Sequence, residues 1–199
     1  MQNLYRRTLA TASAFLALTA AACGSSVAGA PAPTPIVVTA ASVRAAFDSS
    51  TMKSAHFKLH GTMIKKPGYY PVTGDGIIQL APREAFLMNL RVQTYSSLGV
   101  LKIQEVSVGG KDYSRVGTGG WSSKRSTASP TAPTSYVGEE ILAGTSVWHA
   151  RSTALHSTYD MWIRESDGYI LQLVYSGASG NFTMIFDSYN KSPLIPTPR

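Results

Sequence analysis

Histidine, serine and acidic side chains are the groups in this 199-residue sequence that could support metal or hydrolytic chemistry. His56 and His60 are four positions apart, which places them on one face of an extended strand. A metal site needs further ligands, and neither a cysteine nor a nearby acid completes the set, so exposed strand histidines are expected. His149 and His156 have opposite phase in one candidate strand, so they do not converge and are predicted to be structural.

Catalytic motifs are missing around the many serines. No Gly-x-Ser-x-Gly nucleophile elbow is present, and the glycine-rich segment 117–120 lacks the lysine and the following helix of a phosphate-binding loop. The acidic residues offer no evident acid–base pair: Asp75, Glu84, Glu105, Glu139 and Glu140. We therefore expect a protein that is not an enzyme and needs no cofactor or metal, with an envelope hydrolase as the least favoured alternative.

The chain has one cysteine, Cys23, which excludes an internal disulfide. It follows a basic head with Arg6 and Arg7, a short apolar run over 8–19 and three alanines at 20–22. This order is typical of a secretory signal, and the run is shorter than the ~20 residues of a membrane span.

The same segment resembles the lipobox of bacterial lipoprotein signals, with Ala20 where the pattern prefers leucine and Leu18 two positions further back. The resemblance implies removal of residues 1–22 and acylation of Cys23, with chains such as palmitate. The product would be anchored by lipid at the extracytoplasmic face of the cell membrane. The alternative is an ordinary signal cut after one of the alanines, which would leave a free thiol.

Three parts are predicted: a signal over 1–22, a lipidated cysteine with a flexible linker over 23–39, and one domain over 40–199. The linker is rich in Ala, Pro, Ser and Gly and has no apolar periodicity. Loss of Arg6 and Arg7 lowers the formal charge from +7 to +5. This surplus is either chance or an attraction to anionic head groups. Nucleic acid is not expected, because no basic–aromatic cluster appears.

The domain must begin with a helix and continue as strands. Val43, Ala46 and Phe47 share a helical face over 40–52, with Ser42 as the candidate cap. From Ser54 the apolar period is two, a bulge is expected near Glu105, and a short second helix is predicted over 136–142. Strands are predicted from 54, over 74–80, 85–92, 100–108 and 111–116 after a Gly109–Gly110 turn, and over 147–155, 158–165, 169–175 and 181–187. A Pro-containing loop spans 123–134, and Pro193, Pro196 and Pro198 end ordered pairing.

This pattern predicts an α+β fold with a curved antiparallel sheet. Its inward set is large and comprises Phe57, Leu59, Phe86, Met88, Leu90, Met161, Ile163, Leu171, Leu173, Phe182, Met184 and Phe186. One or two short helices cover too little of such a face, so either the sheet curls on itself or something else fills the gap.

Several segments in order resemble the LolA-like lipoprotein carriers, in particular the mycobacterial LppX/LprG-type lipoproteins. They are the strand from Ser54 to Leu59, the hairpin over 105–113 with Gly120 and Trp121, the segments Val147–His149 and Asp160–Ile163, and the ending Phe186–Asn190 with Ile195 and Pro196. The resemblance covers residues 40–198.

The resemblance implies a half-barrel with one or two helices over its concave face, enclosing an apolar cavity for a lipid or another acylated ligand, with transfer across the envelope and an envelope transport partner. A monomer is expected. The ligand-binding residues would be the inward set without Phe186, and Lys65 and Lys66 at the rim would meet anionic head groups. The chain is short for the family and has a Pro-rich loop over 127–134, so a smaller cavity, or none, is compatible with it.

Two further points stay open in the sequence. Trp121, Trp148 and Trp162 either fill the core, which is favoured, or line a ligand slot. A protein-binding or regulatory envelope module without a cavity is the alternative to a lipid carrier.

Overall fold

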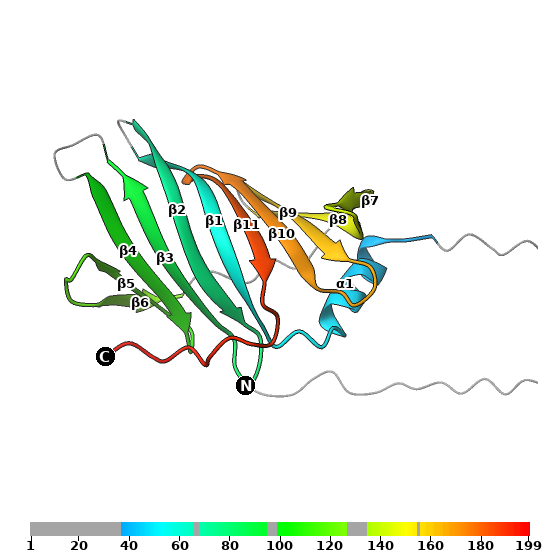
Figure 1. The fold of residues 1–199 in the computed structure, drawn as a ribbon, viewed down its shortest axis with the longest axis horizontal. Coiled ribbons are helices and arrows are strands. Elements are labelled where there is room, and N and C mark those ends of the chain that lie inside the picture. Colours follow the sequence, from blue (N-terminus) through cyan, green and yellow to red (C-terminus); the bar gives the residue numbers. More distant parts are fainter. Residues whose placement is uncertain (1–36, 66–67, 95–98, 127–134, 155) are drawn as a thin grey trace, which may run out of the picture. The chain divides into compact units, whose positions relative to one another are not determined.

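Two-residue alternation makes most of the chain extended, and the computed structural model has one helix and eleven strands (Figure 1). It describes residues 37–199 except 66–67, 95–98, 127–134 and 155. The elements are α1 (Ala40–Asp48), β1 (Ser54–Lys65), β2 (Gly68–Gln79), β3 (Ala85–Gln93), β4 (Val100–Val108), β5 (Lys111–Val116), β6 (Ser122–Arg125), β7 (Ser135–Leu142), β8 (Thr145–Ala154), β9 (Ser157–Arg164), β10 (Ile170–Gly177) and β11 (Gly180–Asp187).

All eleven strands form one open antiparallel sheet in the order β6-β5-β4-β3-β2-β1-β11-β10-β9-β8-β7. The first six run outward from the centre to one edge, and the last five run from the other edge back to the centre. There β11 pairs with β1, from His56 opposite Asp187 to Met63 opposite Gly180. The predicted large antiparallel sheet is confirmed.

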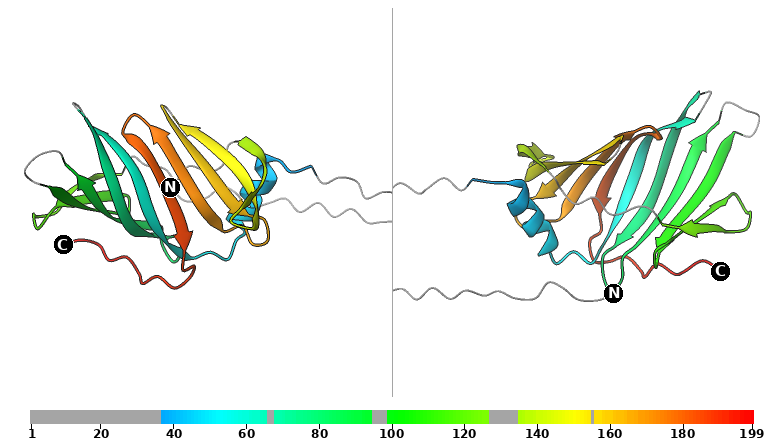
Figure 2. Two further views of the ribbon diagram at one scale, coloured as in Figure 1. Left: turned by 45° about the horizontal axis from the view of Figure 1, so that its top comes forward. Right: turned by 180° about the vertical axis from the view of Figure 1, so that it is seen from behind.

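The length of the chain between the two sheet edges requires the sheet to curl. β6 ends at Arg125 and β7 begins at Ser135, so the ten residue steps between them span at most about 36 Å. Eleven flat strands spaced about 4.8 Å apart would separate the edges by about 48 Å. The edges must therefore lie closer than in a flat sheet, and the views in Figures 1 and 2 show a strongly twisted and curled one.

Helix α1 begins at a capping box formed by Thr39 and Ser42. The Thr39 hydroxyl accepts the Ser42 backbone N–H (3.2 Å), and the Ser42 hydroxyl oxygen accepts the Thr39 backbone N–H (2.8 Å). Thr39 is thus the cap, three positions before the predicted one. The sequence did not reveal it, because a serine replaces the acid that usually marks the third helical position. The helix ends at Asp48, earlier than expected, and its Val43 is fully buried.

The predicted second helix over 136–142 is wrong, because this segment forms the edge strand β7. β7 joins β8 through the two-residue turn Ala143–Gly144, in which both residues have positive φ (49° and 80°). A register shift between Tyr136 and Gly138 interrupts its alternation and hides the strand pattern. The fold therefore has a single short helix among the described residues.

The expected bulge near Glu105 is also absent, since residues 100–108 pair with β3 in continuous register. The Gly109–Gly110 turn is present, with φ of 60° and 73°. The loop predicted over 123–134 contains a short strand, because β6 (Ser122–Arg125) pairs with β5.

Each face of the sheet carries a buried cluster. The inner face is defined by Phe57 and Leu59, which pack in one cluster with Val43 of α1. On the outer face, Ile195 of the C-terminal segment packs in a cluster with Val106 and Val108.

Gln79 fastens this C-terminal segment to the outer face. Its side-chain oxygen accepts the Ile195 backbone N–H (3.0 Å), and its amide donates to the Arg83 carbonyl oxygen (2.9 Å). Arg83 in turn donates to the Ile195 carbonyl oxygen (2.8 Å).

Candidate ligand-binding face

Cross-strand register places the predicted ligand-binding side chains on the inner face, with one exception described below. Leu59 lies opposite Met184, and Met184 lies opposite Leu173. Buried in the core are Phe57, Leu59, Leu90, Met161 and Ile163. Half-buried against it are Phe86, Met88, Leu173, Phe182 and Met184. The second group is the one a ligand could contact.

Leu171 is the exception, because it has no register partner: it lies at an irregularity of β10. The register shifts between Ile170 and Gln172, so Ile170 lies opposite Ile163 and takes the core position. Ile170 is buried, whereas Leu171 is half-buried and lies outside the core cluster. The alternation assumed for 169–175 did not include this extra residue.

The structure adds further residues to the accessible group. Met63 and Tyr70 lie opposite each other beyond Gly61, and Leu101 and Ile103 lie opposite Val92 and Leu90. Of the partly buried residues that pack against this core, we call nine the inner apolar face: Met63, Tyr70, Phe86, Met88, Leu101, Ile103, Leu173, Phe182 and Met184. Continuing the alternation of Phe57 and Leu59 past Gly61 would have found Met63.

Helix α1 covers one end of the inner face. Its closest strands are β7 and β8, and Gly168 of the β9–β10 turn approaches it so closely that a Cβ there would overlap the Ala46 carbonyl oxygen. In Figures 1 and 2 the helix lies at the β7–β9 end of the sheet. No second described helix lies over β1–β4, and no enclosed cavity is shown in the described part of the domain.

An aromatic stack organises the centre of the inner face. The ring of Phe57 stacks on Phe86 (centroids 5.3 Å apart, planes at 12°) and lies 5.7 Å from the ring of Phe186. Gly76 stands between the two strands that carry the stack, opposite both Phe57 and Met88. A Cβ at Gly76 would overlap the Phe57 ring, so the missing side chain is what lets this ring reach across β2.

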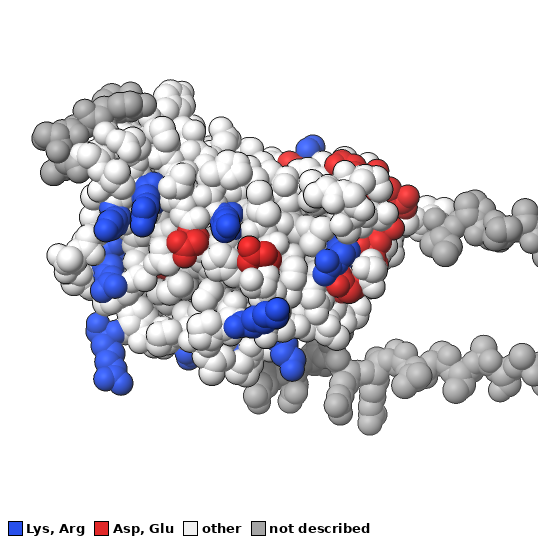
Figure 3. All heavy atoms as spheres, viewed as in Figure 1, with Lys and Arg blue, Asp and Glu red and all other residues white. Residues whose placement is uncertain are grey.

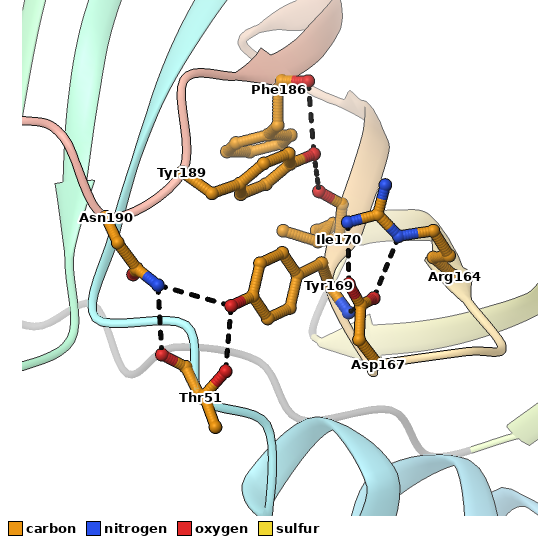
Figure 4. Close-up of polar contacts among 8 residues, drawn as sticks. All are labelled: Thr51, Arg164, Asp167, Tyr169, Ile170, Phe186, Tyr189 and Asn190. Carbon is orange, nitrogen blue, oxygen red and sulfur yellow. Dashed lines mark hydrogen bonds and ion pairs between the residues drawn. The ribbon is translucent and has the colours of Figure 1, made fainter.

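Polar contacts tie the connection between α1 and β1 to the end of the sheet (Figure 4). The Asn190 side chain accepts the Lys53 backbone N–H (2.6 Å) and donates to the Thr51 carbonyl oxygen (3.2 Å). Tyr189 donates to the Ile170 carbonyl oxygen (2.8 Å), and burial raises its pKa to about 12. The predicted Phe186–Asn190 ending is thus a structural clamp.

His149 forms a carboxylate cluster on the outer face that the sequence did not predict. Its Nδ1 lies 2.7 Å from Glu140 Oε1, its Nε2 lies 2.9 Å from Asp160 Oδ1, and its ring stacks on Trp162. Trp162 donates to the other Glu140 oxygen (2.7 Å). Both ring nitrogens are occupied, so His149 has none left to activate a nucleophile.

The remaining histidines form no catalytic or metal arrangement among the described residues. His56 and His60 share the outer face, as predicted, and His56 Nδ1 lies 2.9 Å from Asp187 Oδ1. His156 lies in the turn between β8 and β9 rather than in a strand. Within the described ranges, no histidine bonds a serine hydroxyl, and no group of three His, Cys, Asp or Glu side chains is arranged so that it could hold a metal ion.

The three tryptophans have different positions. Trp148 packs against the inner core, as the core interpretation requires. Trp162 belongs to the His149 cluster, and Trp121 packs near Ile195 with the Arg115 guanidinium 4.7 Å from its ring centre.

Some sequence predictions concern residues that the structure does not describe. Cys23, the signal, most of the linker and Lys66 lie outside the described residues. In the described ranges, no helix has the length and apolar character needed to cross a bilayer.

Comparison with known proteins finds solved structures of low sequence identity. No protein-family model and no curated protein matches the sequence. LprF from Mycobacterium bovis is 11% identical with a TM-score of 0.44, covering 79% of this chain and 97% of LprF. LppX from Mycobacterium tuberculosis is 12% identical (TM-score 0.45; 78% and 99% covered). A LolA-superfamily protein from Nitrosomonas europaea is 10% identical (TM-score 0.37; 80% and 96% covered). The chain is thus similar to LolA-like and LppX-type proteins, at low identity.

Proposed function

We propose that the inner apolar face binds the hydrocarbon of a lipid or another acylated ligand. The supporting observation is that nine apolar side chains on one face stay half-buried, while the single described helix covers only the β7–β9 end. An acyl chain laid on such a surface gains about 0.8 kcal/mol for each methylene removed from water. Binding of this kind makes and breaks no covalent bond.

In the same proposal, the domain acts at the extracytoplasmic side of a cell membrane. An acylated Cys23 would hold it there, and residues 24–39 would give it reach. The domain would lift an acyl chain from one membrane and release it to an acceptor.

Replacing Met184 by glutamate tests the ligand face. Met184→Glu puts a charge among half-buried apolar side chains, so we expect at least tenfold weaker binding of a fluorescent fatty acid. The matched control is Ile185→Glu on the neighbouring residue, which points to the outer face, is 48% exposed and lies opposite Lys58. This control should bind the fatty acid like the unchanged full-length chain.

Native mass spectrometry of the chain purified from membranes provides the second readout. Bound lipid that is lost in Met184→Glu and kept in Ile185→Glu supports the proposal. Equal fatty-acid binding by both variants, with no lipid on the purified chain, contradicts it.

The edge strand β7 favours a second candidate, a protein-binding module. Ile141 (70% exposed) and Val137 (49% exposed) are apolar side chains on a strand whose second edge pairs with no described strand, the kind of surface to which a partner strand can add. Photocrosslinking from position 141 in cells that captures one dominant protein, together with a chain free of lipid, would favour this candidate.

A further inference from the structure

The outer face carries a groove at the end of the sheet where β2 and β4 begin and β3 ends. It has a volume of about 390 Å³ and is lined by Pro71, Thr73, Arg91, Gln93, Val100 and Lys102. These side chains come from three neighbouring strands, β2, β3 and β4. The groove lies on the face opposite the inner apolar face, so it is a separate site.

Two cations face each other in this groove without acidic partners. Arg91 lies directly opposite Lys102, an arrangement that destabilises a sheet unless an anion lies between the charges. Both side chains are exposed, and neither forms an ion pair with a described residue. The acid in the adjoining row, Asp75, accepts a hydrogen bond from Asn89 instead (3.3 Å).

The groove also belongs to a wider separation of charge. Lys and Arg gather on the β3–β5 side of the face in Figure 3, whereas Asp and Glu gather mainly toward β7 and α1. The acids of that far side include Glu140 and Asp160, both held in the His149 cluster. A negative surface would therefore attract the β3–β5 side first, and Arg91 and Lys102 belong to this side.

Exposed apolar side chains accompany the cations. Val100 is 48% exposed within the groove, and Tyr69, near the start of β2, is 64% exposed. Cations beside an exposed tyrosine and an aliphatic side chain are the combination found where proteins rest on lipid head groups. A free anion in water would need the cations but not the apolar neighbours.

We propose that this groove docks on a bilayer through its described residues on β2, β3 and β4, with the phosphate of an anionic lipid head group held between Arg91 and Lys102. The inference rests on the proposed function, because it says how a lipid-binding domain meets its membrane. It adds a site on the outer face that the inner apolar face does not contain.

The test compares vesicles of phosphatidylcholine alone with vesicles that also contain phosphatidylglycerol. It uses the full chain with Cys23→Ser, so that no acyl anchor contributes and residues 1–36 are equal in all samples. Arg91→Gln with Lys102→Gln should lower affinity for the anionic vesicles by about 30-fold and leave affinity for neutral vesicles unchanged. The control, Lys124→Gln with Arg125→Gln on β6, removes the same charge from two exposed side chains and should keep the preference.

Three outcomes would overturn the docking surface. The first is an equal loss of affinity for anionic vesicles in both double variants, which would assign binding to net charge. The second is an unchanged chain that shows no preference for anionic over neutral vesicles. The third is displacement of the vesicles by millimolar inorganic phosphate, which would indicate a site for soluble phosphate. Fatty-acid binding is measured in the same samples. Its retention by Arg91→Gln with Lys102→Gln separates this site from the inner apolar face, and its absence in the unchanged chain contradicts the proposed function instead.

Discussion

At the residue scale, the absence of a side chain at Gly76 makes room for the aromatic stack of the inner face. It lies between Phe57 and Met88 in register, and the Phe57 ring occupies the space that a Cβ would need. The same Cβ would also overlap the Leu87 carbonyl oxygen, which belongs to the backbone and cannot move cheaply. The aromatic stack at the centre of the inner face therefore depends on a glycine at this position.

We predict that Gly76→Ala lowers the free energy of unfolding by about 1–3 kcal/mol, the usual range for overpacking a filled interior. Urea denaturation followed by tryptophan fluorescence measures the change. Gly120→Ala is the matched control, since a Cβ there meets nothing within 4 Å. Equal stability of the two variants would show that the stack tolerates a side chain at 76.

The His149 cluster gives the domain a dependence on pH. The hydrogen bond from Trp162 holds the pKa of Glu140 below its ordinary value of 4.5. Burial alone would raise the pKa of Asp160, but hydrogen bonds from Arg151 and His149 outweigh it and hold the value below 3.8. Both carboxyls bind a proton more weakly in the folded chain than in the unfolded one. Their stabilisation is therefore present above the ordinary values and is lost as pH falls through the lowered ones.

We predict that the free energy of unfolding falls as the pH is lowered below about 4.5, measured by urea denaturation across the acid range. Glu140→Gln with Asp160→Asn should be less stable at neutral pH and should show a flatter pH dependence. Glu84→Gln, which removes an exposed acid that forms no ion pair with a described residue, should leave the stability at neutral pH unchanged. An unchanged slope in the double variant would contradict the assignment.

At the scale of elements, the β7–β8 turn contains an alanine with an unfavourable backbone conformation, Ala143. It occupies the left-handed region (φ 49°) in the two-residue turn between β7 and β8, where asparagine or glycine is the preferred type. An alanine in that region costs about 1–2 kcal/mol relative to glycine. The turn thus stores strain that a substitution can release.

We predict that Ala143→Gly raises the free energy of unfolding by about 0.5–1 kcal/mol, visible as a higher melting temperature. Ala178→Gly in the β10–β11 turn serves as control. Ala178 does not have positive φ, so glycine there gains no relief and should be neutral or destabilising. A lower melting temperature for Ala143→Gly would refute the strain.

Local pattern predicted most strands because each carries its own alternation. The segment 85–92 reads clearly as a strand and forms β3. The strand at 135–142 could not be predicted in the same way, because a register shift near Gly138 and the atypical Ala143 turn remove both signals. In β10, an extra residue places Ile170 in the core, where the sequence predicted Leu171.

Long-range contacts lay beyond what the sequence could predict. The inner face followed from alternation alone, since side chains two positions apart share a face. The His149 cluster joins β7, β8 and β9, and the groove joins β2, β3 and β4, so both depend on register between strands. No spacing within one strand signals either of them.

The pairing of β1 with β11 governs the molecule as a whole. It joins residues 131 positions apart, as in the contact between His56 and Asp187, and it is the seam between two sequential meanders. Contacts so distant in sequence form late and slowly during folding. Until β11 has been synthesised and arrives, the first half-sheet exposes the unpaired flank of β1, a template for aggregation. Removing β11 by truncation should therefore leave two half-sheets with unpaired flanks, and such a chain should aggregate.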